Sequence, residues 1–341
     1  MARGGAEKVV SILANSYASC GWAVSVVLLL RNDVGYALDP SIEIIDLSCG
    51  ARSRLTSLPM WIAGLRKVLK SKKPDAVVSF AARINVIALV SSVGLGCPVV
   101  VSERNDPSRD GRGMTTRIAT ELLYPIAKKV VFQTRRARAA FSDRVGKNSV
   151  IIANPVNVQC LRNEANINRK IVTLGRLTAQ KNQKMLIDAF SLISKRFPDY
   201  SLYIYGEGEL EGALRQQIND LSLSGSVELM GNVPEVHKCI SDAQIFVLPS
   251  DYEGMSNALL EALAMGFPCV STNCAGSDEI IVDGWNGLLV PVGDTAELAN
   301  AILRIIRSKA LESDLSKHAL RSSEAFESSV IVSKWKEIIE A

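Results

Sequence analysis

Short apolar runs alternate with amphipathic stretches along almost the whole chain. The apolar runs are rich in Val, Ile and Leu and are bounded by Gly, Pro or charged residues, which is typical of buried strands. They occupy residues 23–30, 42–47, 76–80, 98–102, 130–133, 150–152, 170–174, 201–205, 227–230, 244–248, 268–272 and 287–290. Helices are expected between them, at residues 10–17, 61–72, 183–196, 209–221 and 235–241, and from residue 295 onward. This alternation predicts an α/β protein with parallel sheets covered by helices on both faces.

A polar stretch without periodicity, residues 163–169, separates two similar halves of this pattern. The 341 residues are enough for two domains of ordinary size. We therefore expect a first domain over residues 1–162 and a second over 163–328. A C-terminal helix over 329–341 is expected to cross back to the first domain.

Composition favours a cytoplasmic globular protein. Apolar residues make up 48% of the chain, but no run is long enough to span a bilayer, and no signal peptide is visible. The seven cysteines are odd in number and lack CxxC spacing, so we expect reduced thiols in the core. With only His237 and His318, a zinc site built on several histidines is excluded and no Ser-His-Asp triad is evident.

Charge is divided unequally along the chain. Residues 1–165 hold 23 Lys and Arg and 12 Asp and Glu, a net charge of +11, whereas the remainder holds 16 and 23, a net charge of −7. The basic clusters at 52–73 and 128–138 have two interpretations: they are solvated helix faces, or they bind an anionic membrane surface. The second interpretation would place the protein peripherally at the inner face of the plasma membrane. Nucleic acid is not expected as a partner, because these clusters lack interleaved aromatic residues.

Two glutamates eight residues apart bracket a strand-to-helix turn. Glu253 follows the strand at 244–248, and Glu261 lies inside the next helix, for which Ser256 is the expected N-cap. Ligands bind at the carboxyl ends of strands in open parallel sheets, and a helix start offers N–H groups that suit a phosphate. Glu261 would need hydrogen bonds, which sugar hydroxyls supply. Two solvated glutamates are the alternative, and the spacing alone does not decide between them.

A second strand end carries two cations. Gly175 permits a tight turn after the strand at 170–174, so that Arg176 and Lys181 can reach the same crevice and grip phosphate groups. Solvation of the turn is the structural alternative. A third strand end, Gly206-Glu207-Gly208, resembles a dinucleotide fingerprint and suggests an NAD-dependent oxidoreductase as an alternative function, but the neighbouring glutamates would repel a pyrophosphate.

The front half has candidate positions of its own. Gly4 and Gly5 open a helix and would let the backbone approach a ligand. Glu103, Arg104 and Asn105 follow the strand at 98–102, where they form either a site that faces the crevice or a salt-bridged surface loop.

Taken together, these motifs resemble those of the retaining GT-B glycosyltransferases of family 4. Four elements occur in the family's order: Gly-Arg-Leu…Lys-Asn from Gly175, the Gly-Glu-Gly turn from Gly206, Pro-Ser…Glu-Gly-Met-Ser-Asn from Pro249, and Gly-Trp-Asn-Gly-Leu-Leu-Val from Gly284. The resemblance covers almost the whole chain and is strongest over residues 170–294. It implies a GT-B fold, in which two Rossmann-like domains with parallel sheets face each other across a cleft that holds a nucleotide-sugar donor.

The resemblance also implies residue roles. Arg176 and Lys181 would bind the donor diphosphate, Glu261 the ribose hydroxyls and Glu253 the transferred sugar, so that Glu253, Arg176 and Lys181 are the catalytic candidates. The other implied donor-binding positions are Gly175, Gly206, Gly254, Met255, Ser256 and Asn257. No metal or cofactor is implied. The donor would be a UDP-sugar, and the acceptor a lipid-linked glycan or polysaccharide, such as lipopolysaccharide, made for the cell surface.

The chain departs from the family's pattern at two places. Many members carry a histidine in the front domain at the donor sugar, whereas this front domain has none and Arg104 is the residue of that neighbourhood. In the family a complete strand precedes the Gly4-Gly5 element, so we expect that this first strand is missing here. A nucleotide-sugar epimerase of related architecture and a nucleic-acid-binding module remain alternative interpretations.

Overall fold

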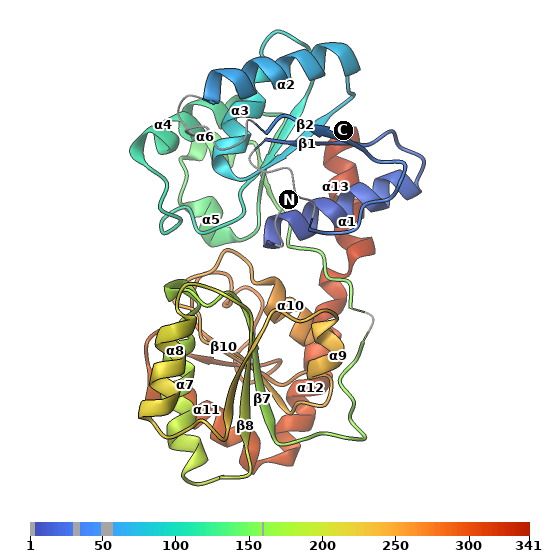
Figure 1. Cartoon of the computed structure of the whole chain (residues 1–341). Helices are drawn as coiled ribbons and strands as arrows, with labels where there is room; N and C mark the ends of the chain where they lie inside the picture. Colours follow the sequence, from blue (N-terminus) through green and yellow to red (C-terminus); the bar gives the residue numbers. More distant parts are fainter. Residues whose placement is uncertain (1–3, 30–34, 49–56, 159) are drawn as a thin grey trace. The chain divides into compact units, whose positions relative to one another are not determined.

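The computed structural model describes residues 4–29, 35–48, 57–158 and 160–341 (Figure 1). The chain forms two compact units, one made of the residues up to 155 with 328–341, and the other of residues 156–327. The division therefore falls before the expected boundary at 162/163. The reason is that residues 162–168 are tied to the second unit: Arg162 N–H donates to Met265 O at 2.8 Å, and Asn163 N–H to Ser241 O at 2.7 Å. The expectation that a first strand is missing before Gly4 concerns residues 1–3, which lie outside the described residues.

The second unit is built on one parallel six-stranded sheet. Its strands are β7 (Lys170–Leu174), β8 (Ser201–Tyr205), β9 (Val227–Gly231), β10 (Ile245–Leu248), β11 (Cys269–Thr272) and β12 (Leu288–Val290). They are arranged in the order β12-β11-β10-β7-β8-β9. The chain runs outward in one direction from β7 and then returns to β10 beside it, which is the strand order of dinucleotide-binding domains. The crevice between the ends of β7 and β10 is therefore the point where ligands are expected.

Helices cover both faces of this sheet. They are η2 (Ala179–Lys181), α7 (Gln183–Ser194), α8 (Glu211–Asp220), α9 (Val236–Ile240), α10 (Asn257–Ala264), α11 (Thr295–Arg307), α12 (Lys309–Ser323) and η3 (Glu324–Phe326). Figure 1 shows α7, α8 and α11 on one side of the strands and α9, α10 and α12 on the other. Because both faces are covered, the strands are apolar on both sides, as in β10, where all four residues are buried.

The first unit contains two separate parallel sheets among its described residues. One has four strands in the order β3-β4-β5-β6, and the other pairs β1 with β2. The strands are β1 (Ser25–Leu28), β2 (Glu43–Asp46), β3 (Val77–Phe80), β4 (Val99–Ser102), β5 (Lys129–Phe132) and β6 (Ser149–Ile151). The helices are α1 (Gly5–Ser19), α2 (Leu58–Lys72), α3 (Ala82–Ser92), α4 (Met114–Leu123), η1 (Tyr124–Ile126), α5 (Arg135–Ala139), α6 (Asp143–Gly146) and α13 (Ser328–Glu340).

The C-terminal helix α13 completes the core of the first unit. Trp335 is fully buried and clusters with Val9 and Leu13 of α1 and with Val100 of β4. Tyr17 OH donates to Val332 O at 3.4 Å. The helix therefore supplies a buried layer to a sheet whose strand β4 lies more than 200 residues earlier in the chain.

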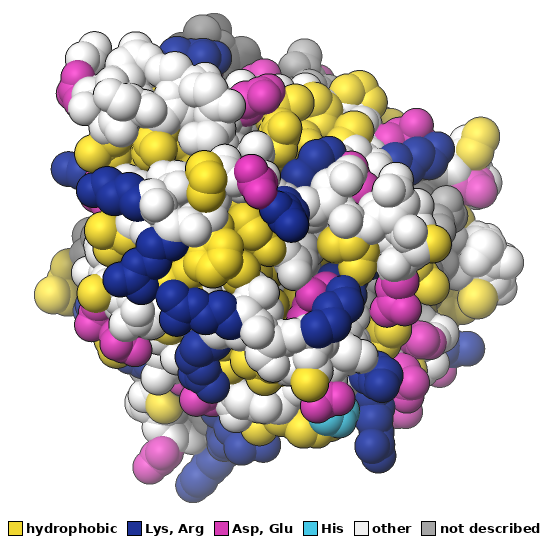
Figure 2. Space-filling model, turned by 90° about the horizontal axis from the view of Figure 1, so that it is seen from below, with side chains coloured by type: hydrophobic (Ala, Val, Ile, Leu, Met, Phe, Trp, Pro, Cys, Tyr) yellow, Lys and Arg dark blue, Asp and Glu magenta, His cyan; other side chains and the backbone are white. Residues whose placement is uncertain are grey.

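The surface agrees only in part with the sequence expectations. No helix among the described residues is long and apolar enough to cross a membrane. Cys20 and Cys239 are exposed, so the expectation that the thiols lie in the core is wrong for these two, whereas Cys269 and Cys274 are buried. Figure 2 shows one face of the molecule, where many Lys and Arg side chains border an exposed hydrophobic area.

We predict that replacing Trp335 by Ala lowers the free energy of unfolding of the first unit by about 3–5 kcal/mol, the usual cost of emptying a large aromatic site. Urea unfolding followed by circular dichroism measures it. Lys336→Ala on the same helix, where the Lys336 side chain is 47% exposed, serves as the control and should change stability by less than about 0.5 kcal/mol. A loss for Trp335→Ala no larger than the small loss expected for the control would show that burial of Trp335 does not stabilise the unit.

Candidate functional site

The predicted site residues of the second unit come together at the carboxyl edge of its sheet. The loops that follow β7 and β10 lie side by side, because these strands are neighbours in the sheet. Gln180 Nε2 donates to Tyr252 O at 2.9 Å, and Asn182 Nδ2 donates to Asp251 Oδ1 at 2.7 Å. Asp251 N–H in turn donates to Gln180 O at 2.9 Å. These bonds fix the two loops against each other, although 69 to 72 residues separate the partners in sequence.

An ion pair lies at the centre of these loops. Lys181 Nζ is 2.5 Å from Glu253 Oε1, and Ser250 Oγ donates to the same oxygen at 2.7 Å. The Glu253 side chain is only 7% exposed and that of Lys181 16%. A carboxylate this deeply buried requires such partners, because desolvation would otherwise strongly disfavour its charge. Two catalytic candidates that the sequence placed in one crevice are thus in direct contact.

Arg176 differs from Lys181 in its surroundings. It is exposed, and its side chain has no ion pair among the residues that the structure describes. Its backbone carbonyl accepts from Gln183 Nε2 at 2.9 Å, which anchors the turn while leaving the guanidinium group at the surface. The loop therefore holds one paired cation and one exposed cation.

Two glycines allow the loops to pack at backbone distance. A Cβ on Gly206, whose φ is +137°, would lie 2.0 Å from Gly175 O, and one on Gly276, whose φ is +89°, would lie 1.8 Å from Gly254 O. Any side chain at these positions would collide with a main-chain carbonyl. Close contact with the loop after β7 is thus sufficient to explain the glycine at 206.

The helix after Glu253 presents the second glutamate. The N-cap prediction for Ser256 is confirmed, because Ser256 Oγ accepts from Leu259 N–H at 3.4 Å at the start of α10. Glu261, buried in this helix, has its Oε2 2.9 Å from His237 Nε2 of α9. Sequence reasoning did not associate His237 with the site. Its only signal was that it is one of two histidines in the chain.

Glu103 of the front candidates is part of a buried polar network. Arg112 Nη2 donates to Glu103 Oε2 at 2.6 Å, and Tyr124 OH donates to Glu103 Oε1. Burial and the charge of Glu103 raise the pKa of Tyr124 well above its usual value, so the phenol keeps the proton that it donates. Asn85 Nδ2 donates to Tyr124 OH at 3.0 Å and closes the network. In this structure the salt-bridge alternative therefore describes Glu103, although the pair is buried rather than at the surface.

The other front candidates lie near the ends of their elements. Arg104 Nη1 donates to Asn154 Oδ1 at 2.7 Å, and its guanidinium group lies over the rings of Phe80 and Trp335. Burial lowers the pKa of Arg104 to about 9, and its Nε and Nη2 are buried without a hydrogen-bond partner among the described residues. Asn105 Oδ1 accepts from Asp106 N–H at 3.0 Å.

Gly4 and Gly5 begin α1. Gly4 is the N-cap residue, and its carbonyl accepts from Lys8 N–H at 3.1 Å. Across the described residues, no group of three or more His, Cys, Asp or Glu side chains is arranged to hold a metal ion.

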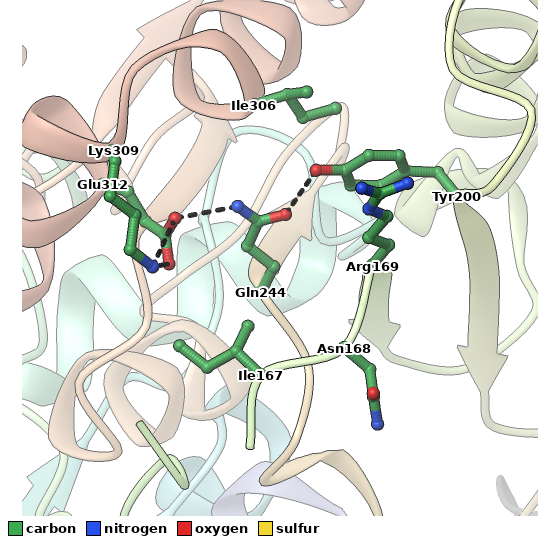
Figure 3. A pocket seen from close by; sticks show the side chains of 8 residues that line it. All are labelled: Ile167, Asn168, Arg169, Tyr200, Gln244, Ile306, Lys309 and Glu312. Atoms are coloured by element: carbon green, nitrogen blue, oxygen red, sulfur yellow. Dashed lines mark hydrogen bonds and ion pairs between the residues drawn. The ribbon is translucent and has the colours of Figure 1, made fainter. Parts of the chain in front are cut away.

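A pocket of about 220 Å³ lies at the opposite edge of the second sheet, where β7 and β8 begin (Figure 3). Its polar groups bond one another: Tyr200 OH donates to Gln244 Oε1 at 2.7 Å, and Gln244 Nε2 to Glu312 Oε2 at 2.8 Å. Glu312 also forms ion pairs with Lys309 and with the buried Arg162. The network holds α12 against the sheet, and we do not assign the pocket to the chemistry at the carboxyl edge.

Both halves of the chain match known protein families. Residues 168–308 match the family described as glycosyl transferases group 1, and residues 4–156 match the glycosyl transferase 4-like domain. Together these matches include both loops of the Lys181–Glu253 pair and the front candidates.

Individual relatives and solved structures agree with these matches. The chain is 27% identical to the N-acetylgalactosamine-N,N'-diacetylbacillosaminyl-diphospho-undecaprenol 4-alpha-N-acetylgalactosaminyltransferase of Campylobacter jejuni, over 95% of this chain and 93% of that protein. It is 32% identical to the lipopolysaccharide core biosynthesis glycosyltransferase LpsE of Rhizobium meliloti, over 43% of this chain and 42% of that protein. Its fold is similar to that of Anabaena HepE in complex with UDP-glucose, with a TM-score of 0.84, 20% identity, and coverage of 99% of this chain and 96% of that one.

We predict that the Lys181–Glu253 pair is energetically coupled. Lys181→Met should lower the free energy of unfolding by up to about 3 kcal/mol, because it leaves the buried Glu253 carboxylate without its cation. Glu253→Gln in the same chain should recover at least half of that loss, since the orphaned charge is then removed. Urea unfolding of the two single variants and the double variant forms the required cycle. Strictly additive losses would contradict the coupling.

Proposed function

This chain belongs to the group 1 glycosyltransferases, a retaining GT-B family, and we propose that it transfers a sugar from a UDP-sugar to a lipid-linked or polysaccharide acceptor of cell-surface glycan synthesis. The observation that carries the proposal is the Lys181–Glu253 pair at the carboxyl edge of the second sheet. A cation and a carboxylate held there by two rigid loops suit a donor with an anionic diphosphate and a hydroxylated ring.

The donor is proposed to lie along the loops after β7 and β10. Arg176, Lys181 and the Gly175 turn would hold the diphosphate, together with backbone groups of Gly254–Asn257 at the start of α10. Glu261 would bind the ribose hydroxyls, and its contact with His237 would orient the carboxylate. Gly206 would contribute by letting its loop pack against Gly175.

The chemistry follows from the charges. Breaking the bond between sugar and phosphate leaves negative charge on the diphosphate and positive charge on the anomeric carbon. Arg176 and Lys181 would stabilise the first, and the Glu253 carboxylate lies where it could face the second. We propose transfer on the same face of the sugar, with the leaving phosphate taking the acceptor's proton. Glu253 is held by an ion pair with Lys181 and a hydrogen bond from Ser250, and these contacts disfavour it as a covalent nucleophile. A glycosyl ester on Glu253 in a mass spectrum would contradict this.

Support for the acceptor comes from the relatives. The names of the Campylobacter jejuni relatives specify substrates linked to undecaprenol through a diphosphate, and LpsE acts in lipopolysaccharide core synthesis. We propose that the first unit meets the acceptor at the inner face of the plasma membrane, through Gly4, Gly5, Arg104 and Asn105, whereas the buried Glu103, paired with Arg112, keeps a structural role next to them. Arg104 has the strongest case among them, because two of its donor atoms lack partners among the described residues.

We predict that Arg176→Ala and Lys181→Ala each lower the rate of UDP-sugar turnover by about 100- to 1,000-fold, the usual cost of losing one preorganised donor at a leaving group. Release of nucleoside diphosphate measures the rate, after a screen of nucleotide-sugars for thermal stabilisation. Lys184→Ala, on the exposed side of α7, is the matched control and should be nearly silent. Wild-type turnover in both loop variants would refute the proposed diphosphate site.

We also propose that catalysis needs no metal, and we predict that an excess of EDTA leaves turnover unchanged. Lys181, Arg176 and the α10 start would supply the charge stabilisation that a divalent ion provides in other transferases. The assay compares rates in EDTA with rates after addition of Mg²⁺ or Mn²⁺. Loss of activity in EDTA with recovery by one of these ions would overturn this part of the proposal.

A further inference from the structure

Helix α4 of the first unit turns its most apolar face to the solvent. Met114, Ile118 and Leu122, each four residues apart, are 70%, 53% and 60% exposed. The one fully buried residue of this helix is the polar Thr120. Surface helices of globular proteins normally show the reverse arrangement, with the apolar stripe towards the core. The packing of the unit itself therefore does not explain this stripe.

The exposed apolar area continues beyond the helix. Ile126 of η1 is 58% exposed, and Val93 at the end of α3 is 57% exposed. These two residues also line a groove of about 420 Å³, whose other lining residues are Leu89, Ser92, Gly96, Cys97, Pro98, Val99 and Lys128. We refer to Met114, Ile118, Leu122, Ile126 and Val93 together as the α4 surface. A patch of this kind on a protein marks a site of contact with another molecule or a membrane.

Cations accompany the α4 surface. Arg117 belongs to α4 itself, Lys128 lines the groove beside Ile126, and Arg66 Nη1 donates to Val93 O at 2.7 Å. These three side chains donate to backbone carbonyls, and among the described residues no carboxylate neutralises their charge. The acidic residue of α4 is Glu121, and its carboxylate accepts a hydrogen bond from Ser142 Oγ at 2.7 Å.

The whole first unit adds to this local charge. Its residues, up to 155 and from 328 to 341, include 24 Lys and Arg against 13 Asp and Glu, a net charge of +11. An apolar stripe flanked by basic residues is the arrangement with which an amphipathic helix lies in the plane of an anionic membrane. The charge therefore favours a lipid surface over a neutral protein partner.

We propose that the α4 surface docks the protein on an anionic membrane, with Met114, Ile118 and Leu122 inserted among the lipids and Arg117 at the headgroups. This inference rests on the proposed function in one respect: docking is useful because the membrane would present a lipid-linked acceptor. Its evidence, the outward stripe and its cations, is independent of the donor site.

The test measures binding of the full chain to vesicles by flotation. Wild-type protein should bind vesicles that contain phosphatidylglycerol, bind phosphatidylcholine vesicles weakly, and lose affinity as salt is raised. Ile118→Asp and Leu122→Asp should each weaken binding roughly tenfold or more, because an exposed apolar side chain that would insert into the lipid is replaced by an anion. Leu192→Asp is the matched control, since Leu192 of α7 is 43% exposed on the second unit, and it should bind like wild type.

Thermal melts establish that the variants are folded, and Ile118→Ser replaces Ile118→Asp if the charged variant melts early. Absence of wild-type binding, or equal loss in the Leu192 control, overturns the proposal. So does a wild-type dimer in light scattering that Ile118→Asp converts to a monomer without any vesicle binding, which would identify a contact between two copies of this chain. Stabilisation by a UDP-sugar without vesicle binding refutes docking alone. Vesicle binding without stabilisation by any nucleotide-sugar refutes the proposed function and leaves docking intact.

Discussion

The adjacency of β7 and β10 is the constraint on which the candidate site depends. Because the chain leaves β7 in one direction and returns to β10 beside it, two loops about 70 residues apart in sequence share one edge of the sheet. Lys181 and Glu253 can then form their ion pair, and the hydrogen bonds of Gln180 with Tyr252 and Asp251 keep the loops in register. Neither loop alone could bury a charge, since each supplies the counterion that the other needs. The strand order of the sheet thus brings the two loops of the candidate site together.

The first unit uses similar chemistry for a structural purpose. Glu103 follows β4 just as Glu253 follows β10, and each carboxylate is buried beside a cation. The difference lies in the remaining partners. Tyr124 and Asn85 extend the Glu103 network into the core, whereas the loops around Glu253 also carry Arg176, whose exposed side chain has no ion pair among the described residues. The exposed cation beside the Glu253 pair is therefore the feature that makes it, rather than the Glu103 pair, the candidate site for an anionic ligand.

The sequence predicted the second unit better than the first for a physical reason. Its strands are apolar on both faces, so runs such as residues 170–174 and 201–205 were recognised at their full length. Met114, Ile118 and Leu122 of α4 face outward, and the helix follows a Gly-rich loop, so no strong core-facing periodicity marks that helix in the sequence. The two compact units divide at 155/156, ahead of the expected 162/163, because residues 163–169 are polar in composition but tied by their backbone to the second unit. The contact of His237 with Glu261 depends on where α9 packs against α10, which no local pattern reveals.

Local and global charge act in opposite directions in the second unit. Residues 156–327 hold 15 Lys and Arg and 22 Asp and Glu, a net charge of −7, yet the proposed diphosphate site lies among cations. The screening length at physiological ionic strength is about 8 Å, so a bound diphosphate responds mainly to Arg176 and Lys181 rather than to the unit as a whole. Lys181 is already neutralised by Glu253, which leaves Arg176 as the charge that an arriving anion meets first. In the proposed function, the approaching diphosphate would compete with Glu253 for the Lys181 ammonium group, which would free the Glu253 carboxylate to contact the sugar once the donor is in place.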